Sequence, residues 1–144
     1  MLKIRPEQVE AFKPVAEDGF VRRIAEHVRA RHPRAVVRLP ERLTVAGRLE
    51  DATLLALVRG GVARARRYGV EAESALAAFV VTMFLTAPNF DEHPLIRRVL
   101  ADDKITPDRK IDQLLQSITA RNLKVVKDTY NPAAWNQETG GGTP

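Results

Sequence analysis

The chain contains no cysteine, which excludes disulfide bonds, thiolate nucleophiles and thiolate metal sites. It also lacks a long apolar run. The stretch from Ala75 to Leu85 carries no charge, but it is shorter than the roughly 20 apolar residues that a membrane-spanning helix needs. The first twelve residues, MLKIRPEQVEAF, have no apolar segment of the kind found in signal peptides. These absences lead us to expect a cytoplasmic protein with no membrane partner.

A recognisable catalytic set is lacking as well. The histidines form neither an i, i+4 pair nor an HExxH motif; they are His27, His32 and His93. The serines have no GxSxG setting, and Gly60-Gly61 follow no predicted strand, so neither a nucleophile elbow nor a phosphate loop is predicted. Asp91, Glu92 and His93 are the one cluster that resembles a metal or acid-base site, but such residues before a helix are ordinary capping residues. We expect no catalytic residue, no metal, no cofactor and no enzymatic activity.

What is present is a strongly apolar stretch at residues 72–87, AESALAAFVVTMFLTA, bounded by acidic residues before it and by Pro88 after it. Leu76, Val80 and Phe84 recur on one face of a helix, while Phe79 and Met83 lie on a neighbouring face. A helix that is apolar nearly all round is a buried one. We therefore expect this segment to be the central helix of the fold.

Further helices are expected around it. Apolar spacing and end signals predict helices at about 6–31, with a kink or short break at Pro14, and at 51–68, 92–101 and 106–128. Gly69 follows the second of these helices, where a left-handed residue is favoured. Residues 34–50 show no sustained period and predict an irregular loop. The prediction is an all-α, single-domain bundle of about five helices at residues 1–128, followed by an extended tail at residues 129–144.

The charge of +5 is unevenly placed, because residues 1–70 hold 15 of the 23 Lys and Arg but only 8 of the 18 acidic residues. This asymmetry fits contact with an acidic protein patch or with nucleic acid. The alternative is a compositional bias with no function, since Arg greatly outnumbers Lys. A helix-turn-helix interpretation fails because its second helix would be the apolar segment 72–87.

Several motifs resemble those of a known group of proteins. Phe20, Arg22-Arg23 and His32-Pro33 precede the string ARARRYGVEAESALAAFVVTMFLTAPNFDEHP, and Ile111 to Leu115 follow it. Over residues 3–118 the chain resembles small all-helical bacterial proteins encoded beside spike-tip, PAAR and effector genes of type VI secretion systems. The resemblance implies an accessory role, in which an adaptor or co-chaperone holds an effector or spike component before loading. It supplies no catalytic residues.

The leading hypothesis is thus a helical protein-binding module whose partner is an effector, a spike component, a chaperone or a second copy of the chain. Its predicted partner-binding residues are Arg59, Arg66, Arg67, Tyr130 and Trp135. One alternative is a nucleic-acid-associated protein that uses its Arg-rich helix faces, with binding that weakens steeply as salt rises. Another is a small hydrolase or metal protein centred on residues 91–93.

Overall fold

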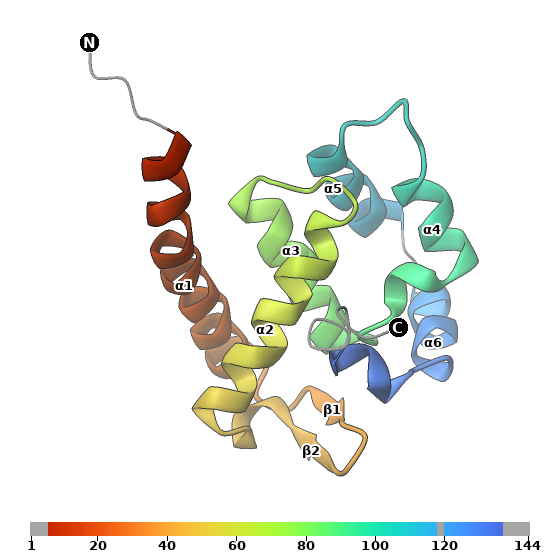
Figure 1. The fold of residues 1–144 in the computed structure, drawn as a ribbon. Helices are drawn as coiled ribbons and strands as arrows, with labels where there is room; N and C mark the ends of the chain where they lie inside the picture. The colour runs from red at the N-terminus through yellow and green to blue at the C-terminus, as the bar shows by residue number, and fades with distance from the viewer. Residues whose placement is uncertain (1–5, 118–119, 137–144) are drawn as a thin grey trace.

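The computed structural model describes the backbone of residues 6–117 and 120–136, and the side chains of residues 17–116 and 124–135. Most of this part of the chain is helical, as predicted (Figure 1). The helices are α1 (Pro6–Arg31), α2 (Asp51–Arg66), α3 (Glu73–Leu85), α4 (Pro94–Leu100), α5 (Pro107–Ser117) and α6 (Ala120–Asp128). Among the described residues, no helix is long and apolar enough to cross a membrane.

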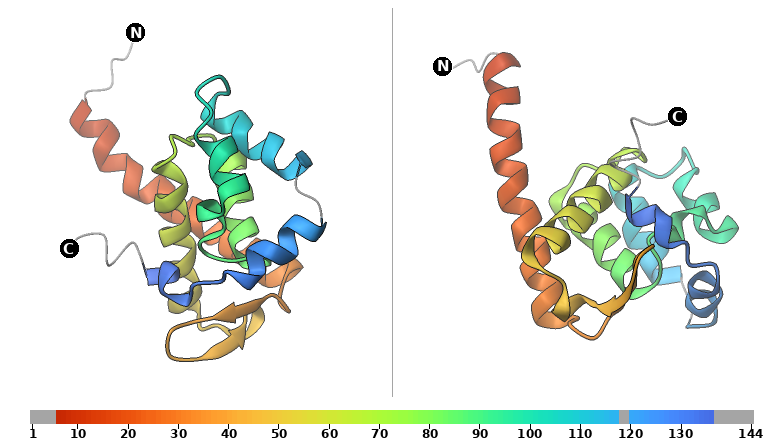
Figure 2. Two further views of the ribbon diagram at one scale, coloured as in Figure 1. Left: turned by 90° about the vertical axis from the view of Figure 1, so that its right-hand side faces the viewer. Right: turned by 60° about the horizontal axis from the view of Figure 1, so that its bottom comes forward.

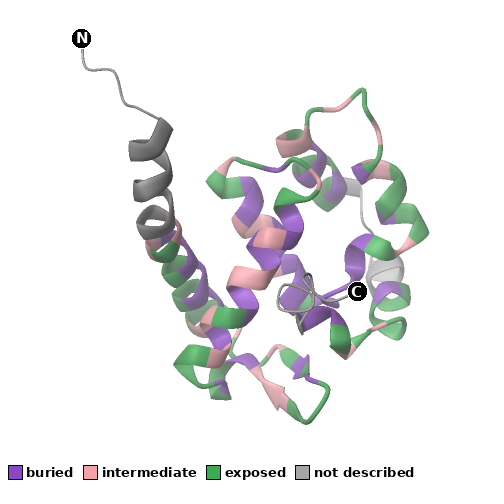
Figure 3. Ribbon diagram, in the orientation of Figure 1, coloured by how far each residue is buried: buried purple, intermediate pink, exposed green. Residues whose placement is uncertain are grey.

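The α3 helix is central, which confirms the prediction for residues 72–87. It contacts α1, α2, α5 and β1, and α2 and α3 lie between α1 on one side and α4 and α6 on the other (Figures 1 and 2). Buried residues concentrate on α2 and α3 (Figure 3). Those of α3 are Ala75, Leu76, Phe79, Val80, Thr82, Met83 and Phe84. Because these side chains cover most of its circumference, α3 organises a single core.

The α2 and α3 helices pack closely as neighbours joined by a short turn. A Cβ on Gly61 would lie 3.0 Å from both Met83 Sδ and Val80 Cγ2, so the missing side chain lets α3 approach. Gly69 in the connecting turn has φ of +83°, which confirms the left-handed residue predicted after α2. The cost of a glycine within α2 is therefore offset by the tight packing of the central helix pair.

The prediction of an irregular loop at residues 34–50 is wrong. Strands β1 (Val36–Arg38) and β2 (Leu43–Val45) pair antiparallel, with Val37 opposite Thr44, and a 3-10 turn, η1 (Ala46–Arg48), follows them. Leu39 and Arg42 exchange backbone hydrogen bonds across Pro40-Glu41. This turn lacks the glycine dipeptides that mark most two-residue hairpins, so the sequence pattern did not reveal it.

Two predicted helix boundaries also change. The α1 helix passes Pro14 without a break, so the predicted break is wrong and the kink stays a prediction. The predicted helix at residues 106–128 is two helices, α5 and α6, with residues 118–119 outside the described part. The α6 helix ends at Asp128, as expected.

The first part of the predicted tail docks on the core and is not extended. It forms a 3-10 helix, η3 (Pro132–Asn136), and another such turn, η2 (Phe90–Glu92), lies between α3 and α4. Asn89 holds the tail at two points: its Nδ2 donates to Thr129 O at 3.0 Å, and its Oδ1 accepts from Asn131 N at 2.9 Å. Trp135 is 4% exposed. Trp135 therefore belongs to the same core as α3, and Tyr130 packs against that core, while residues 137–144 lie outside the described part.

Candidate functional site

A hollow of about 560 Å³ runs along α3 between α1 and α5, and we refer to it as the apolar groove. Its apolar lining residues are Phe20, Ile24, Ala77, Ala78, Val81, Leu85 and Leu115. Ala77, Val81 and Leu85 recur every four residues, and Ala78 precedes Val81 by three, so the four form one stripe on α3. The groove exists because two alanines on this stripe leave space that a larger side chain would occupy.

The groove leaves apolar side chains of α3 and α5 exposed. Leu85 and Leu115 are each 44% exposed, and Val81 is half-buried. Apolar area that remains in contact with water in this way marks an interaction site more often than scattered surface residues do. The central helix is thus covered on most sides and open along one.

Three of the polar side chains at the groove already have partners. Thr82 Oγ1 donates to Ala78 O at 2.7 Å. Arg23 Nη2 lies 3.5 Å from Glu73 Oε2 at the end of the groove nearest the start of α3. Since both charges there are exposed, this ion pair adds little stability and leaves that end close to neutral.

A second hollow of about 370 Å³ lies near the other end of α3, and Leu85 lines both hollows. We call this hollow the basic pocket, because Arg34, Arg38 and Lys127 line it together with Tyr130. Among the described residues, none of its three cations has an ion-pair partner. These cations come from three separate segments, namely the turn after α1, strand β1 and helix α6.

Tyr130 connects the basic pocket to the core. Its hydroxyl accepts from Arg38 N at 3.0 Å and from Trp135 Nε1 at 2.7 Å. The Arg38 guanidinium lies 5.3 Å from the centre of the Tyr130 ring, within the range of a cation-π contact. Burial raises the pKa of Tyr130 and outweighs the opposing effects of Arg38 and Trp135, so the phenol stays protonated.

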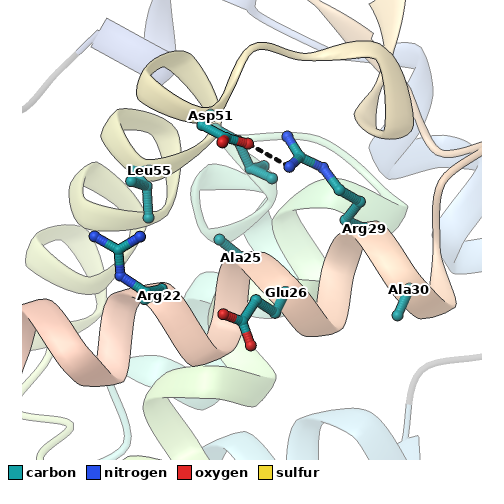
Figure 4. Close-up of a pocket in the computed structure, with 8 residues that line it drawn as sticks. Arg22, Ala25, Glu26, Arg29, Ala30, Asp51 and Leu55 are labelled. Carbon is teal, nitrogen blue, oxygen red and sulfur yellow. Dashed lines mark hydrogen bonds and ion pairs between the residues drawn. The ribbon is translucent and has the colours of Figure 1, made fainter.

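A third hollow, of about 330 Å³, lies between α1 and α2 (Figure 4). Arg29 reaches from α1 to form an ion pair with Asp51 of α2, and its Nη2 donates to Leu49 O at 2.8 Å. The Arg29 hydrogen bond, followed by its charge, lowers the pKa of Asp51. Arg29 therefore links α1 to α2 across this hollow, while its Nε is buried without a hydrogen-bond partner among the described residues.

The cluster at residues 91–93 has a structural role in this arrangement. Asp91 is 2% exposed and accepts from Arg64 Nε at 2.7 Å and from the Tyr68 hydroxyl. Glu92 accepts from Arg64 Nη2 at 2.8 Å. His93 caps α4, because its Nδ1 accepts from Leu95 N at 3.2 Å. Among the described residues, no three His, Asp or Glu side chains converge as metal ligands would.

The Arg64 ion pairs are a feature that sequence reasoning missed. Burial acts to lower the pKa of Arg64, but the hydrogen bonds and charges of Asp91 and Glu92 outweigh it and the pKa is raised. The only local signal was that Arg64 lies at the margin of the apolar stripe of α2. Nothing in the sequence pairs it with a carboxylate 27 residues away.

The structure does not bring the five predicted partner-binding residues together. Arg59 Nη2 lies 2.8 Å from Asp18 Oδ1, and Arg66 forms an ion pair with Glu17, so both hold α2 against α1. Arg67 is exposed at the end of α2. Tyr130 lines the basic pocket, whereas Trp135 packs in the core with its ring 4.9 Å from that of Phe84.

Comparisons with family models, with curated proteins and with solved structures gave no significant match. The apolar groove and the basic pocket share one lining residue, Leu85, at the end of α3. An apolar floor with charge at one end suits noncovalent contact with another polypeptide, in which apolar area supplies affinity and charge supplies orientation.

Proposed function

We propose that this chain is a non-enzymatic, protein-binding accessory module that holds a helix of a partner protein in the apolar groove. The observation that carries the proposal is the open apolar stripe on α3, the helix whose composition demands burial. Amphipathic helices bind such grooves through apolar residues spaced three or four apart. A leucine that goes from exposed to fully buried contributes about 1.5–3 kcal/mol, so covering Leu85 and Leu115 would be favourable.

The resemblance to small helical proteins encoded beside type VI secretion genes supports an effector or a spike component as the partner. In this proposal the chain is an adaptor or co-chaperone for an effector or spike component, and it works in the cytoplasm before loading. The groove suits that role, since a holding protein needs a reversible contact that buries modest apolar area.

The experiment is co-expression of the tagged chain with each protein encoded beside its own gene, followed by co-purification, with a spike-tip, PAAR or effector protein as the expected partner. We expect one of them to co-purify with the wild-type chain and to be lost from Leu85→Glu. The matched control is Leu95→Glu, because Leu95 is 48% exposed but lies on α4 outside the groove. Failure of every such protein to bind, or equal binding by Leu85→Glu, would overturn the proposal.

A further inference from the structure

We infer that the helix held in the apolar groove carries acidic side chains at one end, and that these lie among Arg34, Arg38 and Lys127 in the basic pocket. This inference rests on the proposed function and adds the charge, the length and the direction of the bound segment. It commits the occupant to a partner helix, as opposed to a second copy of this chain.

The length follows from the groove floor. Its lining along α3 runs from Glu73 to Leu85, which at 1.5 Å per residue is about 18 Å, or just over three helical turns. Ala77 and Ala78 at the middle of the floor allow a second helix axis to approach to about 8–10 Å. A helix of about 12 residues with apolar side chains at i, i+4 and i+7 therefore fills the groove.

The charge of the bound helix follows from the residues at the two ends of the apolar groove. Near the start of α3, Arg23 and Glu73 pair with each other. At the Leu85 end, the cations of the basic pocket have no carboxylate partner among the described residues, and Arg38 is positioned by its contact with the Tyr130 ring. Carboxylates at this end would gain three charge-assisted hydrogen-bond donors. At the other end the same carboxylates would face Glu73, so the direction of the bound helix is set by charge.

The cations are also placed to act together with the groove. Leu85 lines both hollows. If an apolar side chain of the partner helix contacts Leu85, an acidic side chain one turn further along that helix reaches the basic pocket. Arg38 is a strand residue of β1 and Lys127 belongs to α6, and both elements are built on the same core as α3. The pocket is thus a preformed feature that binding does not have to assemble.

The test is a selection from a phage-displayed library of helical peptides about 14 residues long, panned on the full chain. We expect the enriched peptides to carry apolar residues at i, i+4 and i+7 and two or more Asp or Glu residues at one end. The tightest peptide, labelled with a fluorophore, is then titrated against the wild-type chain and against variants by fluorescence polarisation.

Three variants distinguish the contribution of the apolar groove to peptide binding from that of the basic pocket. Ala78→Phe fills the groove and Leu115→Glu places a charge on its wall, so each should weaken binding at least about tenfold. Because Leu115 is exposed, its variant is informative even if Ala78→Phe fails to fold. The double variant Arg38→Glu with Lys127→Glu should also weaken binding about tenfold or more. A peptide with its acids replaced by Lys should regain affinity for that double variant alone.

The outcomes distinguish the two proposals. If Ala78→Phe and Leu115→Glu lose binding but the double variant binds with unchanged affinity, the inference of an acidic end is wrong and the proposed function stands. Enrichment of peptides without acidic residues would do the same. If no peptide is enriched and no protein encoded nearby co-purifies, the proposed function falls as well. If the chain dimerises in analytical ultracentrifugation and Leu115→Glu restores the monomer, the occupant is a second copy and the inference is wrong.

Discussion

Arg64 Nε lies 2.7 Å from Asp91 Oδ1, and these two side chains are 5% and 2% exposed. The contact joins α2 to η2, and the Tyr68 hydroxyl donates to the second carboxylate oxygen of Asp91. Both oxygens of a buried carboxylate are thus paired, which is the condition under which a buried charge is tolerated. The ion pair between Arg64 and Asp91 therefore fixes the position of η2, the turn between α3 and α4.

Breaking this ion pair should destabilise the fold strongly. In Asp91→Ala, Arg64 loses its buried carboxylate partner, so we expect the free energy of unfolding to fall by about 3–5 kcal/mol. Urea denaturation monitored by circular dichroism measures this change in the free energy of unfolding. The control is Asp103→Ala, an exposed acid that should change the free energy by about 0.5 kcal/mol or less. Equal stability of the two variants would contradict a structural role for Asp91.

The two tyrosines of the chain should resist ionisation in the folded state. Burial, with the hydrogen bond to Asp91 as a second cause, raises the pKa of Tyr68, and burial raises that of Tyr130. An ordinary tyrosine is half ionised near pH 10, so at that pH the folded chain should show little tyrosinate absorbance. Both groups bind their proton more tightly when folded, so their stabilising contribution is complete below about pH 10 and is lost as pH rises through the folded pKa values. The control is the same titration in denaturant, where both tyrosines should ionise near pH 10. Ionisation near pH 10 in the folded chain as well would show that the two hydroxyl groups are not buried.

Trp135 should report on docking of the tail. Its ring packs on Phe84 and its Nε1 donates to Tyr130, so Trp135→Ala should lower the free energy of unfolding by about 3–5 kcal/mol. Trp135→Phe retains a ring on Phe84 and should cost less. As the single tryptophan, Trp135 should also emit at shorter wavelength in the folded chain than in denaturant. Emission at the denatured wavelength under native conditions would show that the tail is not docked.

Acid should destabilise the fold through two carboxylates. Backbone hydrogen bonds from Glu71 and Ala72 lower the pKa of Asp108 below its ordinary value of 3.8, and Arg29 lowers that of Asp51. Because the folded pKa is depressed, each stabilising contribution is present above the unfolded pKa and is lost as pH falls through the folded one. We expect the free energy of unfolding to fall below about pH 4, with a shallower fall in Asp108→Asn. An identical pH profile in that variant would contradict the assignment.

The helices and their centre were predictable because the signals for them are local. Apolar spacing located α1, α2 and α3, and Gly69 marked the turn after α2 with the positive φ that it adopts. Each of these features depends on interactions within a few residues of the chain. The hairpin at residues 36–45 was missed since its turn is Pro40-Glu41, which carries no distinctive pairing signal.

The site was less predictable, because it is made of residues that are far apart in the sequence. Arg59 and Arg66 were expected to face a partner, but Asp18 and Glu17 of α1 pair with them. Arg34, Arg38 and Lys127 belong to three segments that line one hollow together with Leu85, and only the fold brings them together. An isolated arginine in a sequence does not show whether a carboxylate of the same chain will reach it.

The composition of residues 72–87 already required that this helix be buried, since exposing so many apolar side chains to water is unfavourable. It did not specify which neighbours would cover each face. The hydrophobic effect has no direction, so a stripe such as Ala77, Val81 and Leu85 can be satisfied equally well by the same chain or by another. Only the packing of α1 and α5 decided that this stripe would be left open, and with it where a partner can bind.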